Sequence, residues 1–365
     1  MKNLSFFLLL IVGTLLGNCT SDVKKQEKPK LVIGIVIDQM RYDYLTRFAE
    51  KYGEEGFHRI LKGGFSLESA HFNYIPTYTA VGHASIYTGT TPVNHGIIGN
   101  DWYDKYLKKS IYCVDDNKYS TVGSKSNAGN KSPYRMQTTT IADQLQLAQH
   151  MKGKSIGIGL KDRSAVLPAG HTANAAYWFE GKNEGKWISS SFYMDALPKW
   201  VQDFNALEKA KEYVSSPWNT LYDINTYDKS ISDDNKFETL FKGEEKPTFP
   251  HDIPSLLAEN DNYDLLKEIP GGNYFTTDFV KAAIIGENLG KSEYTDFLAV
   301  SYSSTDYIGH RYGVASKEIE DTYLRLDQDL AELFSFLDRE VGVENYTLFL
   351  TADHAVLDVP SYLKS

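Results

Sequence analysis

The chain has 365 residues, of which 42% are hydrophobic, and it carries a formal net charge of −10. This length and composition are sufficient for a large buried α/β core, arranged as one domain or as two. The chain contains no block of clustered lysines and arginines, which the neutralisation of phosphates along a polymer requires. We therefore expect no nucleic-acid polymer as a partner.

Residues 1–19 have the pattern of a targeting segment. Lys2 supplies a positive charge at the start, and the apolar run after it is too short to span a membrane as a mature helix. The run ends in Leu-Gly-Asn-Cys19, which resembles a bacterial lipobox in which the cysteine is lipidated; ordinary secretory cleavage nearby is the alternative. Residues 20–30 then form a polar tether.

This reading predicts a monomeric protein on the extracytoplasmic side, either periplasmic or membrane-anchored. Its only contact with the membrane would be a lipid on Cys19. In that case Cys113 has no partner within the chain, because the sequence contains two cysteines, and no structural disulfide forms.

Three apolar strands are each predicted to end in an aspartate. Residues 31–37 form a near-continuous β-branched run, typical of a strand buried on both faces of a parallel sheet, and Asp38 follows it. Residues 297–302 and 346–351 are also apolar runs that we expect to be strands followed by acids. The acid and histidine after residues 297–302, Asp306 and His310, are expected in a loop. The acids and histidines that follow these strands are Asp38, Asp306, His310, Asp353 and His354.

The carboxyl ends of parallel strands border the ligand crevice in open α/β sheets, so we expect these five residues to lie together. Asp and His offer the oxygen and nitrogen ligands that zinc prefers. A single aspartate after a strand is more often a helix cap or a turn residue. The joint pattern favours a metal site.

The stretch IPTYTAVGHASIYTGT, residues 75–90, gathers hydroxyl side chains at the start of a predicted small helix. One of them could be a nucleophile. The alternative is that all of them are N-caps and turn residues, since Ser and Thr favour these positions for hydrogen-bonding reasons. The stretch by itself leaves both interpretations open.

Residues 155–160 read as a further strand, preceded by a helix that contains Ile141 and Leu145. Lys161 and Arg163 stand at the exit of this strand, where they are either solvated charges or ligands for an anion. Residues 171–275 are rich in Tyr, Trp, Asn and Pro and show weak periodicity. We expect them to form an insertion over the active-site end of the sheet rather than a second domain.

A long amphipathic helix is predicted after Ser316, a plausible N-cap with acidic residues behind it. Its apolar face steps by four and three residues through Ile319, Tyr323, Leu326, Leu330, Leu333 and Leu337. The strand–helix–strand order predicts a right-handed parallel crossover. The fold class is therefore α/β, with a mostly parallel sheet and helices on both faces.

Four strings, VIDQMRYDYL, YTAVGHASIYTG, GIGLKDRSAVLPAGH and STDYIGHRYG, closely resemble the PafA-type phosphomonoesterases of the alkaline phosphatase superfamily. The resemblance runs from about Lys30 to the end of the chain, and it implies one alkaline-phosphatase-like catalytic domain over residues 31–365. It also implies the hydrolysis of diverse small phosphate monoesters through a phosphothreonine intermediate at a two-zinc site, with release of inorganic phosphate.

The resemblance assigns a role to each matching position. Thr79 would be the nucleophile and would also bind the first zinc ion with Asp38, Asp353 and His354. Asp306 and His310 would hold the second zinc ion. Asn100, Lys161 and Arg163 would grip the phosphoryl oxygens. His83 and His95 do not match ligand positions, and we expect them to be packed or hydrogen-bonded.

The sequence departs from the family pattern at its C-terminal end. Family members continue further and supply a histidine that completes the second zinc site, whereas this chain has no histidine after His354. We therefore expect a C-terminally truncated member whose second zinc site lacks one protein ligand.

Three alternatives to phosphomonoester hydrolysis stay open. The first is a phosphodiesterase or nucleotide pyrophosphatase of the same fold, although the Lys161 and Arg163 pair favours the more highly charged monoesters. The second is an inactive lipoprotein that holds one zinc ion and captures phosphate compounds. The third is a structural surface protein without stoichiometric zinc.

Overall fold

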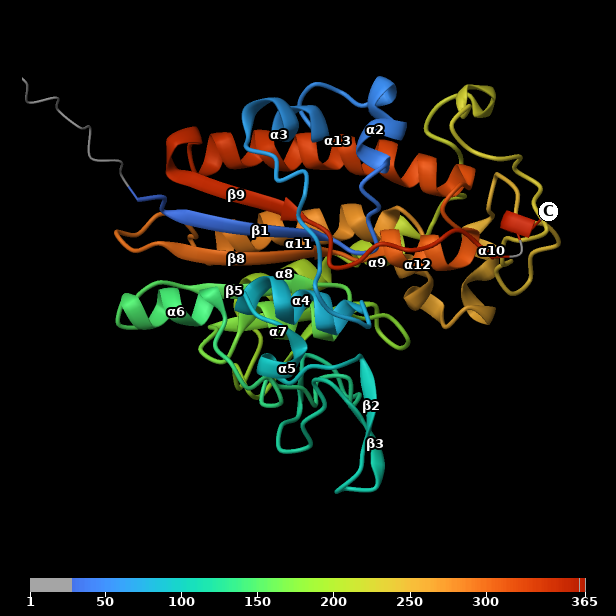
Figure 1. Ribbon diagram of the computed structural model, residues 1–365. Coiled ribbons are helices and arrows are strands. Elements are labelled where there is room, and N and C mark those ends of the chain that lie inside the picture. Colours follow the sequence, from blue (N-terminus) through green and yellow to red (C-terminus); the bar gives the residue numbers. More distant parts are fainter. Residues whose placement is uncertain (1–27, 361, 365) are drawn as a thin grey trace, which may run out of the picture.

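The computed structural model describes residues 28–360 and 362–364. The targeting segment, Cys19 and most of the predicted tether lie outside the described residues. Within them, the central sheet has seven strands in the order β4-β7-β6-β5-β8-β1-β9 (Figure 1). The strands are β1 (Leu31–Ile37), β4 (Thr121–Val122), β5 (Ser155–Gly159), β6 (Ala175–Glu180), β7 (Lys186–Ser190), β8 (Asp296–Tyr302) and β9 (Tyr346–Thr351).

The three strands predicted to deliver acids are neighbours in the sheet. β1 pairs in parallel with β8 on one side and with β9 on the other. Ile37 lies opposite Tyr302, and Val36 lies opposite Thr351, so the three strands end at the same edge. β5 and β6 continue the parallel arrangement, while β7 and β4 are antiparallel. The predicted, mostly parallel α/β sheet is confirmed.

Helices cover both faces of the sheet (Figure 1). Ile33 and Ile35 of β1 share one core with the apolar stripe of α13, whereas Val36 points to the other face and packs near Tyr87 of α4. The helices are α2 (Tyr44–Arg47), α3 (Phe57–Gly63), α4 (Thr79–Thr88), α5 (Pro92–His95), α6 (Ile141–Ala148), α7 (Asp162–Ala169), α8 (Lys199–Ala206), α9 (Lys209–Tyr213), α10 (Ile253–Leu256), α11 (Gly271–Gly286), α12 (Ser304–Tyr312) and α13 (Lys317–Glu340). Short 3-10 helices lie at Ala49–Lys51, Ile224–Thr226, Leu257–Glu259, Asn262–Glu268, Val343–Asn345 and Tyr362–Lys364.

The long helix α13 follows the prediction closely. Ser316 is its N-cap, and the Ser316 hydroxyl accepts a hydrogen bond from the Ile319 backbone N–H at 3.2 Å. All six residues of the predicted apolar stripe are buried. Periodicity and capping were therefore sufficient to place this helix on the sheet.

Residues 175–190 differ from the prediction. We expected them to belong to an insertion over the sheet, but they form β6 and β7, two strands of the sheet itself. All six residues of β6 are buried, and a strand buried on both faces shows no alternation of apolar and polar residues. This explains the weak periodicity. Trp187 of β7 stacks on Phe279 of α11 with ring centroids 4.2 Å apart.

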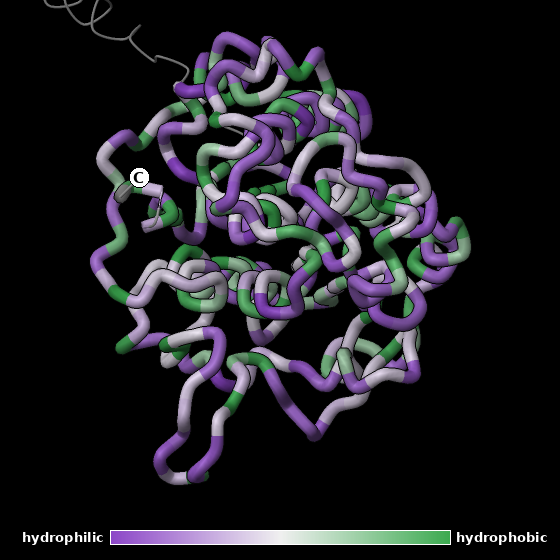
Figure 2. Tube along the Cα trace, turned by 90° about the vertical axis from the view of Figure 1, so that its right-hand side faces the viewer, coloured by the Kyte–Doolittle hydropathy of each residue, from purple (hydrophilic) through white to green (hydrophobic). Residues whose placement is uncertain are grey.

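A two-stranded hairpin, β2 (Asp101–Asp104) and β3 (Lys109–Tyr112), projects from the body of the molecule in both views (Figure 1, Figure 2). The hairpin is closed at its base, where Cys113 donates its backbone N–H to the Asn100 carbonyl at 2.9 Å. In the described part of the chain, no helix is both long and apolar enough to cross a membrane.

Candidate active site at the carboxyl edge of the sheet

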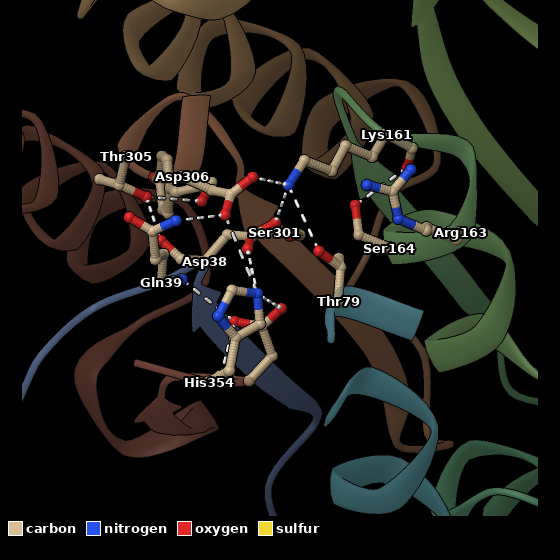
Figure 3. A network of polar contacts seen from close by, with 12 residues as sticks. Asp38, Gln39, Thr79, Lys161, Arg163, Ser164, Ser301, Thr305, Asp306 and His354 are labelled. Carbon is tan, nitrogen blue, oxygen red and sulfur yellow. Dashed lines mark hydrogen bonds and ion pairs between the residues drawn. The ribbon is translucent and has the colours of Figure 1, made fainter. Parts of the chain in front are cut away.

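Asp38, Asp306 and His354, three of the predicted acids and histidines, lie close together near the ends of β1, β8 and β9 (Figure 3). Asp38 follows β1, Asp353 and His354 follow β9, and Asp306 lies on α12, which begins just after β8. Asp38 and Asp353 are fully buried, and Asp306 and His354 nearly so. The ligand atoms of Asp38, Asp306 and His354 all lie within 4.8 Å of one another.

Three carboxylates converge on one imidazole nitrogen. His354 Nε2 lies 3.3 Å from Asp38 Oδ1, 3.7 Å from Asp353 Oδ2 and 3.9 Å from Asp306 Oδ1. Burial disfavours the charged imidazole, but the hydrogen bond and the charge of Asp38, with the charge of Asp353, raise the pKa of His354 to about 9. The cluster therefore has a strong preference for positive charge.

Asp38 Oδ1 and Asp353 Oδ2 are buried and lack a donor in good hydrogen-bond geometry. Each faces an imidazole nitrogen at ion-pair distance, His354 Nε2 at 3.3 Å and His83 Nδ1 at 3.2 Å. Buried acceptors without donors are costly unless a cation satisfies them. The residues fit zinc, since one imidazole nitrogen and carboxylate oxygens from separate strands form a donor set that zinc accepts.

Asp306 and His310 lie on helix α12, not in the loop that we expected after the strand. They are one helical turn apart and therefore on the same face, with His310 Nε2 3.2 Å from Asp306 Oδ1. Burial and Asp38 oppose ionisation of Asp306, but Lys161 and His310 hold the pKa of Asp306 below its usual range. The His310 side chain is 68% exposed, so it lies at the rim of the cluster.

Thr79 is the first residue of α4 and is buried. The next backbone N–H, that of Ala80, donates to Asn100 Oδ1 at 2.9 Å, which holds the Asn100 side chain beside Thr79. The Asn100 amide nitrogen has no hydrogen-bond partner among the described residues and is free to donate. A helix N-terminus also favours an anion through its backbone N–H groups and its dipole.

Gly82 allows α4 to lie directly against the end of β9. A Cβ atom added at Gly82 would stand 2.2 Å from the Asp353 carbonyl oxygen. His83, on the same helix, contacts Asp353 Oδ2 at 3.2 Å and is hydrogen-bonded to the Thr79 carbonyl and to Ser301 Oγ. The prediction that His83 is a hydrogen-bonded histidine is confirmed.

Lys161 lies two residues after the end of β5, and its side chain points into the acidic cluster (Figure 3). Its Nζ lies 2.6 Å from Asp38 Oδ2, 2.5 Å from Asp306 Oδ2 and 3.4 Å from Thr79 Oγ1. Its side chain is only 1% exposed, so the alternative of a solvated charge at a strand exit is wrong for this residue.

Arg163 lies in the first turn of α7, and its Nη1 donates to the Tyr112 hydroxyl at 2.9 Å. Its Nε is buried without a hydrogen-bond partner, and within the described residues Arg163 makes no ion pair. Lys161 and Arg163 both line a pocket of 260 Å³ whose wall also includes Tyr112 and Tyr307. An unpaired, largely enclosed guanidinium beside an open pocket is suited to an anion.

Two residues that organise this site, Gln39 and Tyr112, could not be identified from the sequence pattern. Gln39 donates its backbone N–H to Asp353 Oδ1 at 3.2 Å and its side-chain amide to Asp306 Oδ1 at 2.7 Å. It does so with a φ of +65°, a left-handed conformation that is uncommon outside glycine. The second is Tyr112. Neither residue type carries a pattern that would reveal such a role.

The chain is similar to proteins with established names. The family described as type I phosphodiesterase / nucleotide pyrophosphatase matches residues 32–365. The chain is 51% identical to a calcium-transporting ATPase of Myroides odoratus, over 93% of this chain and 62% of that protein. It is 51% identical to the alkaline phosphatase PhoV of Synechococcus elongatus, over 93% of this chain and 61% of that protein. It is 46% identical to the alkaline phosphatase PafA of Elizabethkingia meningoseptica, over 98% of this chain and 65% of that protein.

The structure is similar to the crystal structure of wild-type alkaline phosphatase PafA. The TM-score is 0.90 at 47% identity, over 93% of this chain and 65% of that one. The resemblance to PafA-type alkaline phosphatases and the α/β fold that it implied are confirmed. The chain spans between 61 and 65% of the length of these relatives.

Proposed function

The chain belongs to the type I phosphodiesterase / nucleotide pyrophosphatase family, and we propose that it is an alkaline phosphatase that hydrolyses phosphate monoesters. The observation that carries this proposal is that Lys161 lies against the hydroxyl of Thr79 and shares a pocket with Arg163. Lys161 Nζ is 3.4 Å from Thr79 Oγ1, and Arg163 lines the same pocket without a carboxylate partner. The similarity to PafA and PhoV, which are named alkaline phosphatases, supports it.

The number of positive charges favours a monoester over a diester. A phosphate monoester brings two negative charges to the site and a diester brings one. Catalysis of phosphoryl transfer depends mostly on positioning and on charge stabilisation, so two cations at the phosphoryl site match the dianion. The Asn100 amide nitrogen adds a neutral donor next to Thr79.

We propose that zinc is the metal. Asp38, Asp353 and His354, with Thr79, would hold one ion, and Asp306 and His310 would contribute to a second. Bound zinc would lower the pKa of coordinated oxygens and neutralise charge that develops on the reacting phosphoryl group. Two buried carboxylate oxygens that lack a donor in good hydrogen-bond geometry, Asp38 Oδ1 and Asp353 Oδ2, support this assignment.

In the proposed reaction the Thr79 hydroxyl attacks phosphorus. The bond from phosphorus to the ester oxygen breaks, a bond to Thr79 Oγ1 forms, the hydroxyl proton is lost, and the leaving alcohol gains a proton. Water then breaks the phosphothreonine bond, which releases inorganic phosphate and restores the hydroxyl. Throughout, Lys161, Arg163 and the amide of Asn100 would hold the non-bridging oxygens.

The roles proposed for Lys161, Arg163 and Asn100 all concern the phosphoryl group, which is common to all monoesters, so we propose a wide range of small monoesters. We also propose that the protein is exported and that it is a monomer. Export rests on residues 1–19. Fractionation of cells that express the full sequence would test export, and sedimentation analysis would test the oligomeric state.

The proposed function is tested with Lys161→Ala and Arg163→Ala, assayed on p-nitrophenyl phosphate and bis-p-nitrophenyl phosphate. Each variant should lose about 100-fold or more in kcat/KM for the monoester, the typical cost of one transition-state donor, and less than about tenfold for the diester. Lys182→Ala is the matched control, because Lys182 lines the same pocket but its side chain is 64% exposed and paired with Asp261.

Three results would contradict the proposal. A wild-type preference for the diester would indicate the phosphodiesterase of the same fold. Equal losses for both substrates would show that Lys161 and Arg163 do not distinguish the doubly charged monoester from the singly charged diester. Tight phosphate binding without turnover in the presence of zinc would indicate an inactive binding protein.

A further inference from the structure

The hydroxyl of Tyr112 stands between two opposite charges. It accepts a hydrogen bond from Arg163 Nη1 at 2.9 Å and donates its own proton to Asp162 Oδ1. Burial and the nearby Asp162 raise the pKa of Tyr112 well above its usual value, so the hydroxyl keeps its proton. The order of donors is therefore fixed, from guanidinium to hydroxyl to carboxylate.

Asp162 has enough donors to hold it in place. Besides the Tyr112 hydroxyl, its Oδ1 accepts the Arg163 backbone N–H at 2.6 Å, and its Oδ2 lies 3.4 Å from Lys131 Nζ. Lys131 also lies over the Tyr112 ring, with Nζ 4.8 Å from the ring centroid. The carboxylate and the ring are thus held together, with the hydroxyl between Asp162 and Arg163.

The hairpin that carries Tyr112 also carries Asn100 to the nucleophile. Tyr112 is the last residue of β3 and pairs with Asp101, the first residue of β2, which directly follows Asn100. Asn100 Oδ1 accepts the Ala80 N–H at 2.9 Å beside Thr79. At the base of the hairpin, Asn100 therefore contacts the helix of Thr79, and Tyr112 contacts Arg163.

We propose that Tyr112 is a positioning residue, whose hydroxyl keeps Arg163 from pairing with Asp162 and so leaves the guanidinium free for a phosphoryl oxygen. This inference rests on the proposed function, because it assumes that Arg163 binds phosphate. A guanidinium and a carboxylate that face each other directly form a bidentate pair. The interposed hydroxyl prevents that pair and takes up one guanidinium N–H.

The test is a double-mutant cycle with Tyr112→Phe, Arg163→Ala and the double variant. Each protein is assayed for kcat/KM with p-nitrophenyl phosphate, and for the dissociation constant of inorganic phosphate by calorimetry. Tyr112→Phe should lower kcat/KM and weaken phosphate binding about tenfold, the range for a hydrogen bond to a charged group. In the Arg163→Ala background the same change should have almost no effect. Tyr103→Phe, on β2 and 60% exposed, is the control.

The outcomes separate the inference from the function on which it rests. If Arg163→Ala weakens phosphate binding and turnover but Tyr112→Phe does not, the positioning role is refuted and the proposed function stands. An equal loss from Tyr112→Phe with and without Arg163 refutes it too, because a general structural defect would act in both backgrounds. If Arg163→Ala changes neither phosphate binding nor turnover, both proposals fail.

Discussion

The close packing of Gly82 of α4 against Asp353, which follows β9, gives a sharp prediction for Gly82→Ala. The new Cβ would lie 2.2 Å from the Asp353 carbonyl oxygen and 2.7 Å from Asp353 Cβ. An ordinary contact begins at 3.4 Å, so α4 and the chain at Asp353 must separate by about 1.2 Å. The obstacle is backbone and cannot rotate away. Overpacking of this kind typically costs about 1–3 kcal/mol of stability.

The functional loss should exceed the loss of stability. Asp353 is one of the proposed zinc ligands and Thr79 begins the displaced helix, so the change separates nucleophile from metal. Misplacement by about 1 Å can cost about 100-fold in rate. We therefore expect Gly82→Ala to lower kcat/KM for p-nitrophenyl phosphate by about 100-fold or more and to weaken zinc binding by roughly 10- to 100-fold.

The assay compares turnover, zinc affinity and melting temperature for Gly82→Ala and for Gly63→Ala. Gly63 is the last residue of α3, and an added Cβ there would meet nothing within 4 Å. Gly63→Ala should be neutral or slightly stabilising, since alanine favours helix. Wild-type activity and zinc affinity in Gly82→Ala would refute the close packing of α4 on Asp353 as a requirement of the site.

Other predictions concern the nucleophile and two buried carboxyl groups of α13. Thr79→Ala should remove monoester turnover by at least about 1000-fold, whereas Thr79→Ser should keep measurable turnover, because a hydroxyl remains; equal activity of the two variants would exclude Thr79 as nucleophile. Burial raises the pKa of Asp329 from 3.8 to about 7. The native state then holds a proton that the unfolded state releases, so stability falls as pH rises from about 4 to 7. Asp329→Asn should gain roughly 2–3 kcal/mol relative to wild type between pH 5 and pH 8 in denaturant unfolding; a difference independent of pH would contradict this. Asp327 accepts the backbone N–H groups of Gly53 and Phe57, each at 2.7 Å. Asp327→Ala should therefore destabilise the fold by about 2–4 kcal/mol, and a melting temperature equal to wild type would count against this anchoring.

The sheet that carries the site could be predicted from sequence because its strands have strong patterns. The apolar runs before Asp38 and Asp353 and the periodic stripe of α13 each indicate one type of element. β6 and β7 escaped prediction, because strands buried on both faces lack alternation and their aromatic residues resemble an irregular insertion. The helix that carries Asp306 and His310 was missed for a similar reason, since STDYIGHRY has no clear apolar stripe.

The site residues could be named from sequence, but not their contacts. That Asp38, Asp306 and His354 lie together follows from the parallel order of β8, β1 and β9, which a strand pattern alone does not give. Gln39 and Tyr112 act through hydrogen bonds to residues distant in the chain. Such contacts depend on the assembled fold and leave no trace in local composition.

The central claim is a zinc-dependent monoesterase, and the most direct measurement is turnover of p-nitrophenyl phosphate after chelation and again as zinc is added back. Bound zinc per chain is counted at each step. We expect turnover to be lost on chelation and to return in proportion to bound zinc, and we expect Asp38→Asn, which alters a proposed ligand, to prevent the return. Turnover that survives chelation, or zinc that binds stoichiometrically without restoring turnover, would contradict it.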